Sequence, residues 1–232
     1  MNQGMQTAYP GYAGTGLDAA QRNKVLRNTY WLLALSLVPT VLGAWIGVST
    51  GIIASMGMGM SLIVFLGGAF GFMYAVERTK NSSIGVAVLL GFTFFMGLML
   101  SRMLSAILGF SNGAALIMYA FAGTAAVFFA MATLATVIKR DLSSMGKFLF
   151  IGMIMLLVAM LLNFFFQSTA LMITLSVLAI GIFSAFMLYE IKQVLDGGET
   201  NYISATMGIY LSVYNVFQSL LALLGIFGGE RD

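Results

Sequence analysis

The polar residues that could do chemistry gather near the C-terminal end of a chain that is otherwise almost pure hydrocarbon. Glu190 is a carboxylate near the end of one apolar run, and Ser212 and Asn215 stand three residues apart in the next run. A carboxylate, a hydroxyl and an amide inside a membrane could line a path for Ca²⁺ or for a proton. We therefore take Glu190, Ser212 and Asn215 as a candidate ion or proton site.

A structural role for Glu190 stays open beside this functional one. The residue lies within about two helical turns of the end of its run, where a carboxylate can reach water and avoid the cost of about 3 kcal/mol at the bilayer centre. Arg78, Lys80 and Lys192 are expected at the same membrane face. The alternative is a rim ion pair, for which Arg78 and Lys192 are the candidate cations.

The run that holds Ser212 is polar on two of its sides. One helical stripe recurs every three or four residues and comprises Ser204, Gly208, Ser212, Asn215 and Ser219. A second ridge at i, i+4 spacing comprises Thr206, Tyr210, Tyr214 and Gln218. Such a helix is poorly matched to lipid on all sides, because its hydroxyls and amides need partners. We therefore predict that it lies inside a bundle of helices.

The residue types that are missing exclude several chemistries. The chain has no Cys and no His. Zinc or haem binding through thiolate or imidazole, a Ser-His-Asp triad, a cysteine nucleophile and a disulfide are therefore excluded. Paired acids and Gly-rich nucleotide loops outside the apolar runs are also missing, so the sequence predicts neither an enzyme nor a cofactor.

Composition indicates an integral membrane protein. Hydrophobic residues make up 60% of the 232 residues and charged residues 8%, against roughly one-quarter charged residues in soluble domains. Most apolar runs are close to the ~20 residues with which a helix crosses a bilayer. We predict an all-α fold with one seven-helix domain over residues 24–232, after a disordered cytoplasmic tail over residues 1–23. The expected spans are residues 29–48, 56–76, 83–104, 114–138, 148–166, 169–195 and 202–227.

The basic residues predict how the chain crosses the membrane. With a cytoplasmic N-terminus, nine of the 11 Lys and Arg residues fall in cytoplasmic segments, and only Arg102 and Arg231 fall outside. Seven spans then place the C-terminus on the outer side. The same bias accounts for the net charge of +3 without a nucleic-acid partner.

Two pairs of glycines have a spacing that allows close contact between helices. Gly43 and Gly47 lie in the first expected span, and Gly67 and Gly71 lie in the second. Small residues four positions apart let helix backbones approach each other within a membrane. We interpret both pairs as packing surfaces in preference to dimer motifs.

Four strings of residues resemble the Bax inhibitor family of seven-helix membrane proteins, in particular its bacterial, YccA-like branch. The strings are residues 24–30 (KVLRNTY), 120–128 (AFAGTAAVF), 139–143 (KRDLS) and 197–203 (GGETNYI). The last string, with Tyr210, Tyr214 and Asn215 after it, is the most specific. The similarity runs from about residue 24 to the end of the chain.

This resemblance implies a fold with six helices packed around a central C-terminal helix. For the YccA-like branch it implies a location in the bacterial inner membrane with a periplasmic C-terminus. It also implies a partner there, the AAA+ protease FtsH, which the protein would bind and inhibit and so affect membrane-protein quality control. For other members it implies a pH-sensitive calcium or proton leak gated by two acids.

The sequence departs from the leak pattern at the second acid. Glu190 fills the position on the sixth helix, but the position on the seventh helix falls on Ser212. A carboxylate and a hydroxyl cannot share a proton as two like charges do. The role as an FtsH modulator is therefore favoured, with the Ca²⁺ or H⁺ leak as the alternative.

Two further segments could contact such a protease. Lys139, Arg140 and Asp141 follow the fourth span and form either a solvated turn or a docking surface for the partner. Residues 1–21 form either an inert tail or a handle that an AAA+ protease could engage.

Overall fold

The computed structural model describes residues 19–230, and within this range all of its regular elements are helices. Seven of its helices are long and apolar enough to cross a membrane, which confirms the predicted fold class. Each predicted span overlaps one of them. The seven are α1 (Ala19–Thr50), α3 (Met58–Thr79), α4 (Ile84–Leu108), α5 (Gly113–Val137), α6 (Met145–Phe166), α7 (Thr169–Asp196) and α8 (Tyr202–Gly228). A short helix that the sequence did not predict, α2 (Ile52–Ser55), lies between α1 and α3.

Helix α1 begins earlier than the sequence predicts. Residues 19–23 belong to this helix, so the predicted disorder is wrong for them. Ala, Gln, Arg and Lys are good helix formers, and the stem of Arg22 lies against Gly197 at the end of α7. The rest of the predicted tail and most of the possible protease handle fall in residues 1–18, outside the described residues.

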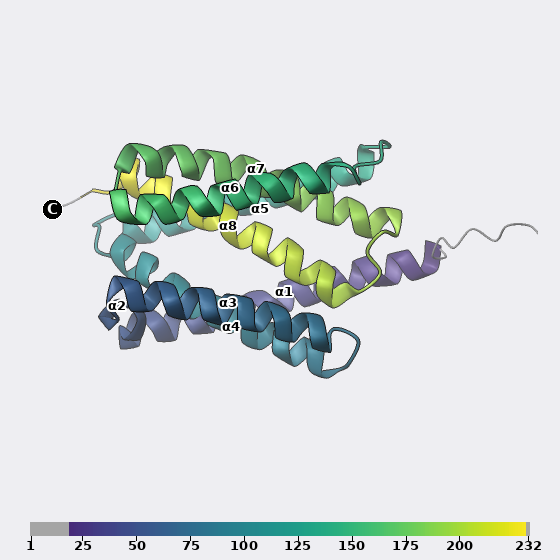
Figure 1. The fold of residues 1–232 in the computed structure, drawn as a ribbon, viewed down its shortest axis with the longest axis horizontal. Coiled ribbons are helices and arrows are strands. Elements are labelled where there is room, and N and C mark those ends of the chain that lie inside the picture. The colour runs from purple at the N-terminus through teal and green to yellow at the C-terminus, as the bar shows by residue number, and fades with distance from the viewer. Residues whose placement is uncertain (1–18, 231–232) are drawn as a thin grey trace, which may run out of the picture.

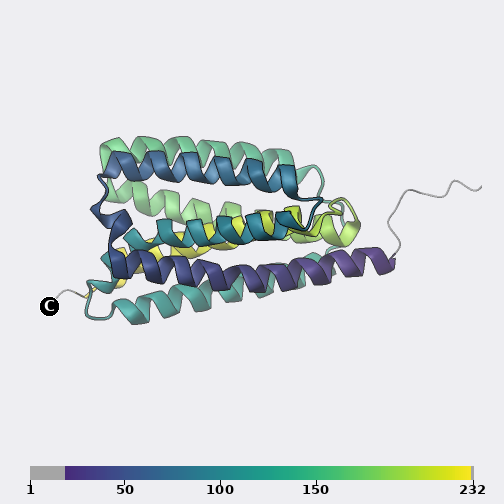
Figure 2. The same ribbon diagram turned by 90° about the horizontal axis from the view of Figure 1, so that it is seen from below.

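Helix α8 runs obliquely between two groups of helices (Figure 1). In one group α4 contacts both α1 and α3, and in the other α7 contacts both α5 and α6. Helix α8 contacts α1, α5 and α7, so it connects the two groups. Figure 2 shows α1 and α3 on opposite faces of the bundle.

The interior position predicted for α8 is confirmed. Phe227 is its only exposed residue, and every other residue of the helix is buried or half-buried. A ring of six around one helix is nevertheless only a loose description. Helix α4 is buried as deeply as α8, whereas α6 packs on α7 and is exposed along most of its length.

Nearly all basic residues of the described chain lie at one end of the bundle, on the right in Figure 1. The start of α1 and the α3–α4, α5–α6 and α7–α8 connections meet there. We call this the basic end, and its Lys and Arg residues are Arg22, Lys24, Arg27, Arg78, Lys80, Lys139, Arg140, Lys147 and Lys192. Helix α2 and the C-terminal end of α8 lie at the opposite end.

The first glycine pair packs as predicted. A Cβ atom added to Gly43 would overlap the carbonyl oxygen of Phe94 in α4, and one added to Gly47 would overlap Ser101. Gly97 of α4 makes the reciprocal contact, because a Cβ there would overlap the carbonyl oxygen of Thr40. The α1 and α4 backbones therefore touch along a seam that only glycine allows.

The second glycine pair does not pack within the chain, so that interpretation is wrong. A Cβ atom on Gly67 or on Gly71 would meet no atom within 4 Å. The glycine of α3 that does face a neighbour is Gly68, which lies against the ring of Phe95.

Candidate functional site

Glu190 and Ser212 meet between α7 and α8. The hydroxyl of Ser212 donates a hydrogen bond to Glu190 Oε2 over 2.8 Å. Ser212 is buried, with 2% of its surface exposed, and Glu190 is half-buried. The structure therefore brings together two of the three residues of the predicted ion or proton site.

Gly208 makes room for the carboxylate. It lies one turn before Ser212 on α8, and a Cβ atom there would stand 2.5 Å from Glu190 Oε1. Sequence reasoning placed Gly208 on the small, polar stripe but gave it no role. A glycine is needed at this position of the stripe, because any larger side chain would overlap the Glu190 carboxylate of the neighbouring helix.

Asn215 does not join Glu190. Its Nδ2 atom donates to the carbonyl oxygen of Leu211 on its own helix, at 2.8 Å. Ser204, which shares the stripe, has a buried hydroxyl without a hydrogen-bond partner among the described residues. The polar stripe of α8 therefore supplies one direct contact to Glu190, through Ser212.

The alternative rim ion pair is not what the structure shows. Lys192 bonds to Asp196 Oδ1 at 2.6 Å, one turn along α7. Arg78 donates from Nε to the hydroxyl of Tyr74 at 2.9 Å, and its guanidinium lies over that ring. Within residues 19–230 no cation lies within ion-pair distance of Glu190. Each cation finds a nearer partner on its own helix, at the i, i+4 spacing that brings side chains together.

The second polar ridge of α8 holds the helix against α1 and α4. The Tyr210 hydroxyl lies 2.9 Å from Thr40 Oγ1 of α1 and donates to the Thr93 carbonyl of α4 at 3.4 Å. The Tyr214 hydroxyl donates to the carbonyl of Met96 at 3.2 Å. The two ridges thus serve different neighbours, one α7 and the other the α1–α4 pair.

The loop residues Lys139, Arg140 and Asp141 are all exposed at the basic end. Ser143 donates to Asp141 Oδ1 from its backbone N–H at 2.8 Å and from its hydroxyl at 2.6 Å. These hydrogen bonds lower the pKa of Asp141, with a smaller contribution from Lys192. The loop therefore presents two cations beside a fixed carboxylate.

No metal-binding cluster is found in the described part of the chain, where no three Asp, Glu, His or Cys side chains come together.

Comparison with known protein families shows which family this chain is similar to. The family described as "Inhibitor of apoptosis-promoting Bax1" matches residues 22–229. The chain belongs to this Bax inhibitor family. The family resemblance of the four strings is therefore confirmed.

Relatives within the Bax inhibitor family have similar lengths. The "Modulator of FtsH protease YccA" of Escherichia coli (strain K12) is 37% identical over 210 residues, which cover 90% of this chain and 92% of that protein. The "Inner membrane protein YccA" of Escherichia coli O6:H1 gives the same values. An uncharacterised protein of Pseudomonas aeruginosa is 37% identical over 211 residues, 89% of this chain and 90% of its own.

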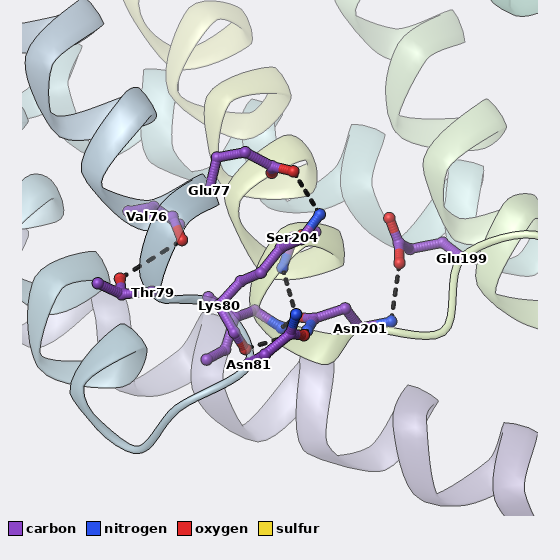
Figure 3. A network of polar contacts seen from close by, with 9 residues as sticks. Val76, Glu77, Thr79, Lys80, Asn81, Glu199, Asn201 and Ser204 are labelled. Carbon is purple, nitrogen blue, oxygen red and sulfur yellow. Dashed lines mark hydrogen bonds and ion pairs between the residues drawn. The ribbon is translucent and has the colours of Figure 1, made fainter.

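Residues 197–203 form a hydrogen-bonded connection at the basic end, centred on Asn201 (Figure 3). Asn201 Oδ1 accepts from the backbone N–H groups of Ile203 and Ser204 and so caps α8. Asn201 Nδ2 donates to the Lys80 carbonyl at 3.0 Å and to Asn81 Oδ1 at 2.9 Å. One side chain therefore caps α8 and links it to the α3–α4 connection.

We expect the Asn201→Ala variant to lose about 2 kcal/mol of stability, the upper end of the range for helix caps, because it also loses the link to the α3–α4 connection. Asn201→Ser is the matched control, because serine keeps a capping oxygen and removes only the link, worth about 1 kcal/mol. Thermal unfolding in detergent micelles measures both. Equal losses for the two variants would contradict the separate capping role.

Arg102 is a polar residue whose partners the sequence did not indicate. Its Nη1 atom donates to the Met56 carbonyl at 3.2 Å and to Ser61 Oγ at 3.1 Å. Arg102 therefore ties α4 to the connection before α3 and to the first turn of α3, at the end opposite the basic end.

Proposed function

We propose that this chain is an inner-membrane regulator that binds the FtsH protease and slows its degradation of membrane proteins. The observation that carries the proposal is the match to the E. coli modulator of FtsH protease, at 37% identity over 90% of this chain. In the proposed orientation the basic end faces the cytoplasm and the C-terminus faces the periplasm, in line with the preference of Lys and Arg for cytoplasmic segments.

The architecture supplies a physical reason for resistance to the protease. Extraction of α8 from the bundle would separate Tyr210 and Tyr214 from their partners in α1 and α4 and would expose Ser212 and Glu190 to hydrocarbon. Each unpaired polar group in lipid costs free energy, so a partner that pulls on this chain meets a high barrier. A protease occupied by such a chain degrades other substrates more slowly.

The test is FtsH-dependent degradation of a membrane substrate in proteoliposomes, with and without this protein. We expect the rate of substrate loss to fall as the amount of the protein rises, while the protein itself persists. An unchanged rate at a molar excess of the protein would contradict inhibition.

The exposed loop of Lys139, Arg140 and Asp141 is the proposed docking surface. Replacement of both cations with alanine should weaken the inhibition, because the loop would no longer offer its charges to the protease. Replacement of Arg78 with alanine, a cation at the same end but on α3, is the control and should leave the inhibition unchanged. Equal effects of both changes would point to overall charge and away from this loop.

A second candidate function is a cation or proton leak, favoured by one observation. Glu190 is a half-buried carboxylate inside the bundle with no cation partner among the described residues. A second observation counts against the leak. The position of the second acid in a dicarboxylate gate is filled by Ser212, which donates a hydrogen bond to Glu190 and cannot supply a second negative charge.

We therefore expect wild-type protein and the Glu190→Gln variant to give the same Ca²⁺ and H⁺ flux in proteoliposomes. Glutamine keeps an oxygen that can accept from Ser212, so the variant should also keep its fold. Flux through the wild type that is lost in Glu190→Gln would contradict this expectation and establish the leak.

A further inference from the structure

A shallow cleft of about 300 Å³ opens on the side of α1 near the basic end. It is lined by Arg27, Tyr30, Trp31 and Ala34. One of these lining residues contacts α5, because the ring of Tyr30 stands edge-on to Phe128 with 6.1 Å between ring centroids.

The cleft faces lipid. Trp31 is 73% exposed, and the same face of α1 continues with Leu35 and Val38, which are also exposed. Because these residues follow Arg27 by four, eight and eleven positions, they form one stripe from a cation to hydrocarbon. An apolar stripe on the outside of a membrane span meets acyl chains.

Arg27 stands at the level where headgroups are expected. Five residues earlier, Arg22 lies beside Gly197 in the turn that ends α7. Two residues later, the Thr29 carbonyl accepts from Thr206, close to the start of α8. Arg27 is therefore level with the ends of the neighbouring spans, where Tyr and Trp side chains also concentrate in membrane proteins.

Arg27 has no counter-ion within residues 19–230, and the hydroxyl of Tyr30 has no hydrogen-bond partner there. Two of the acids at the basic end already have cation partners, since Glu77 pairs with Lys80 and Asp196 pairs with Lys192. An exposed guanidinium and a free phenol at the edge of an apolar cleft are suited to an anion that carries a hydrocarbon tail.

We propose that this cleft binds an anionic phospholipid. The guanidinium of Arg27 holds the phosphate, because its planar fork matches phosphate oxygens. Tyr30 donates to a phosphate or ester oxygen, while Trp31 and the space left by Ala34 take the glycerol end and the first part of an acyl chain. Lys24 adds positive charge on the same helix and favours an anionic headgroup over a zwitterionic one.

The two tryptophans of the chain allow a direct test. In the Trp45→Phe variant, Trp31 is the only fluorophore of its kind and reports on the cleft. The protein is placed in vesicles of phosphatidylcholine and phosphatidylglycerol. Brominated acyl chains quench tryptophan, so one sample contains brominated phosphatidylglycerol and a second contains brominated phosphatidylcholine. We expect phosphatidylglycerol to bind at the cleft about fivefold more tightly than phosphatidylcholine, the effect of one basic residue near an anionic lipid.

The ratio of the affinity for phosphatidylglycerol to that for phosphatidylcholine should fall close to one in Arg27→Gln. The ratio should persist in Arg27→Lys, which keeps the charge. Arg78→Gln removes one charge at the same end on the opposite face of the bundle, as Figure 2 shows for α3, and should leave the preference unchanged. Size-exclusion chromatography of each variant is the control for folding.

Three results would overturn the proposal. Equal quenching by the two brominated lipids would remove the preference. An equal loss in Arg27→Gln and Arg78→Gln would show attraction by overall charge and no site. Relief of the quenching by excess inorganic phosphate would show a soluble anion in place of a lipid.

Discussion

Replacing Gly97 with valine is expected to destabilise the bundle by about 3 kcal/mol, the upper end of the usual range for overpacking. A Cβ atom at this position would overlap the carbonyl oxygen of Thr40, which is part of the α1 backbone and cannot rotate away. The whole of α1 would have to move, and Gly43 and Gly47 would lose their contacts with α4. Thermal unfolding in detergent micelles, together with the yield of folded protein, measures the effect.

Gly71→Val is the matched control for this prediction. A Cβ on Gly71 meets no atom within 4 Å, so the same change on α3 should alter stability by less than about 0.5 kcal/mol. A Gly97 variant that melts at the wild-type temperature, or a Gly71 variant that loses as much, would contradict the close contact between α1 and α4.

Replacing Tyr210 with alanine is the second change with a large expected effect, about 4 kcal/mol. Tyr210 is the largest fully buried side chain among residues 19–230, and its ring packs edge-on against Phe92 at a centroid distance of 6.1 Å. Its removal would leave a cavity where α8 meets α1 and α4.

Tyr210→Phe separates the ring from the hydroxyl. Thr40 still donates to the carbonyl oxygen of Ser36 at 2.8 Å, so phenylalanine leaves no buried donor unpaired. We expect this variant to lose only about 1 kcal/mol, the usual net worth of one hydrogen bond. Denaturant titration of both variants provides the comparison, and similar losses would show that the hydroxyl, not the packing of the ring, holds α8 in place.

The interior position of α8 could be predicted from sequence because the signal is local. Hydroxyls and amides at i, i+4 spacing mark two faces of one helix, and both faces need partners in a membrane. The partners of the tyrosine ridge in α1 and α4 could not be predicted, because Tyr210 is 170 residues from Thr40 and 117 from Thr93. Ser212 and Glu190 were placed in one candidate site by the family resemblance, since a spacing of 22 residues does not itself show that two helices meet at this level.

The rim ion pair rests only on the expectation that Glu190, Arg78 and Lys192 lie at the same membrane face. This criterion does not show which charges lie close enough to pair. Lys192 and Asp196 are four residues apart on one helix, and this spacing favours the ion pair that the structure contains. The fold was thus easier to predict than the pairing of individual charges.

The glycine pairs show where sequence information ends. Gly43 with Gly47 and Gly67 with Gly71 have the same spacing, but only the first pair faces another helix. The choice depends on how α1 and α3 are rotated about their axes, and tertiary packing sets that rotation. The cleft at Arg27 also depends on packing, because α5 brings Phe128 against Tyr30.

Purification of the tagged protein from native bacterial membranes that contain a proteolytically inactive FtsH tests the central functional claim most directly. The account predicts that FtsH is retained with the protein after mild detergent extraction. It also predicts that the variant lacking the charges of Lys139 and Arg140 retains less FtsH, while the Arg78→Ala variant retains as much as the wild type. Folded wild-type protein that retains no more FtsH than an unrelated seven-helix membrane protein would contradict the account.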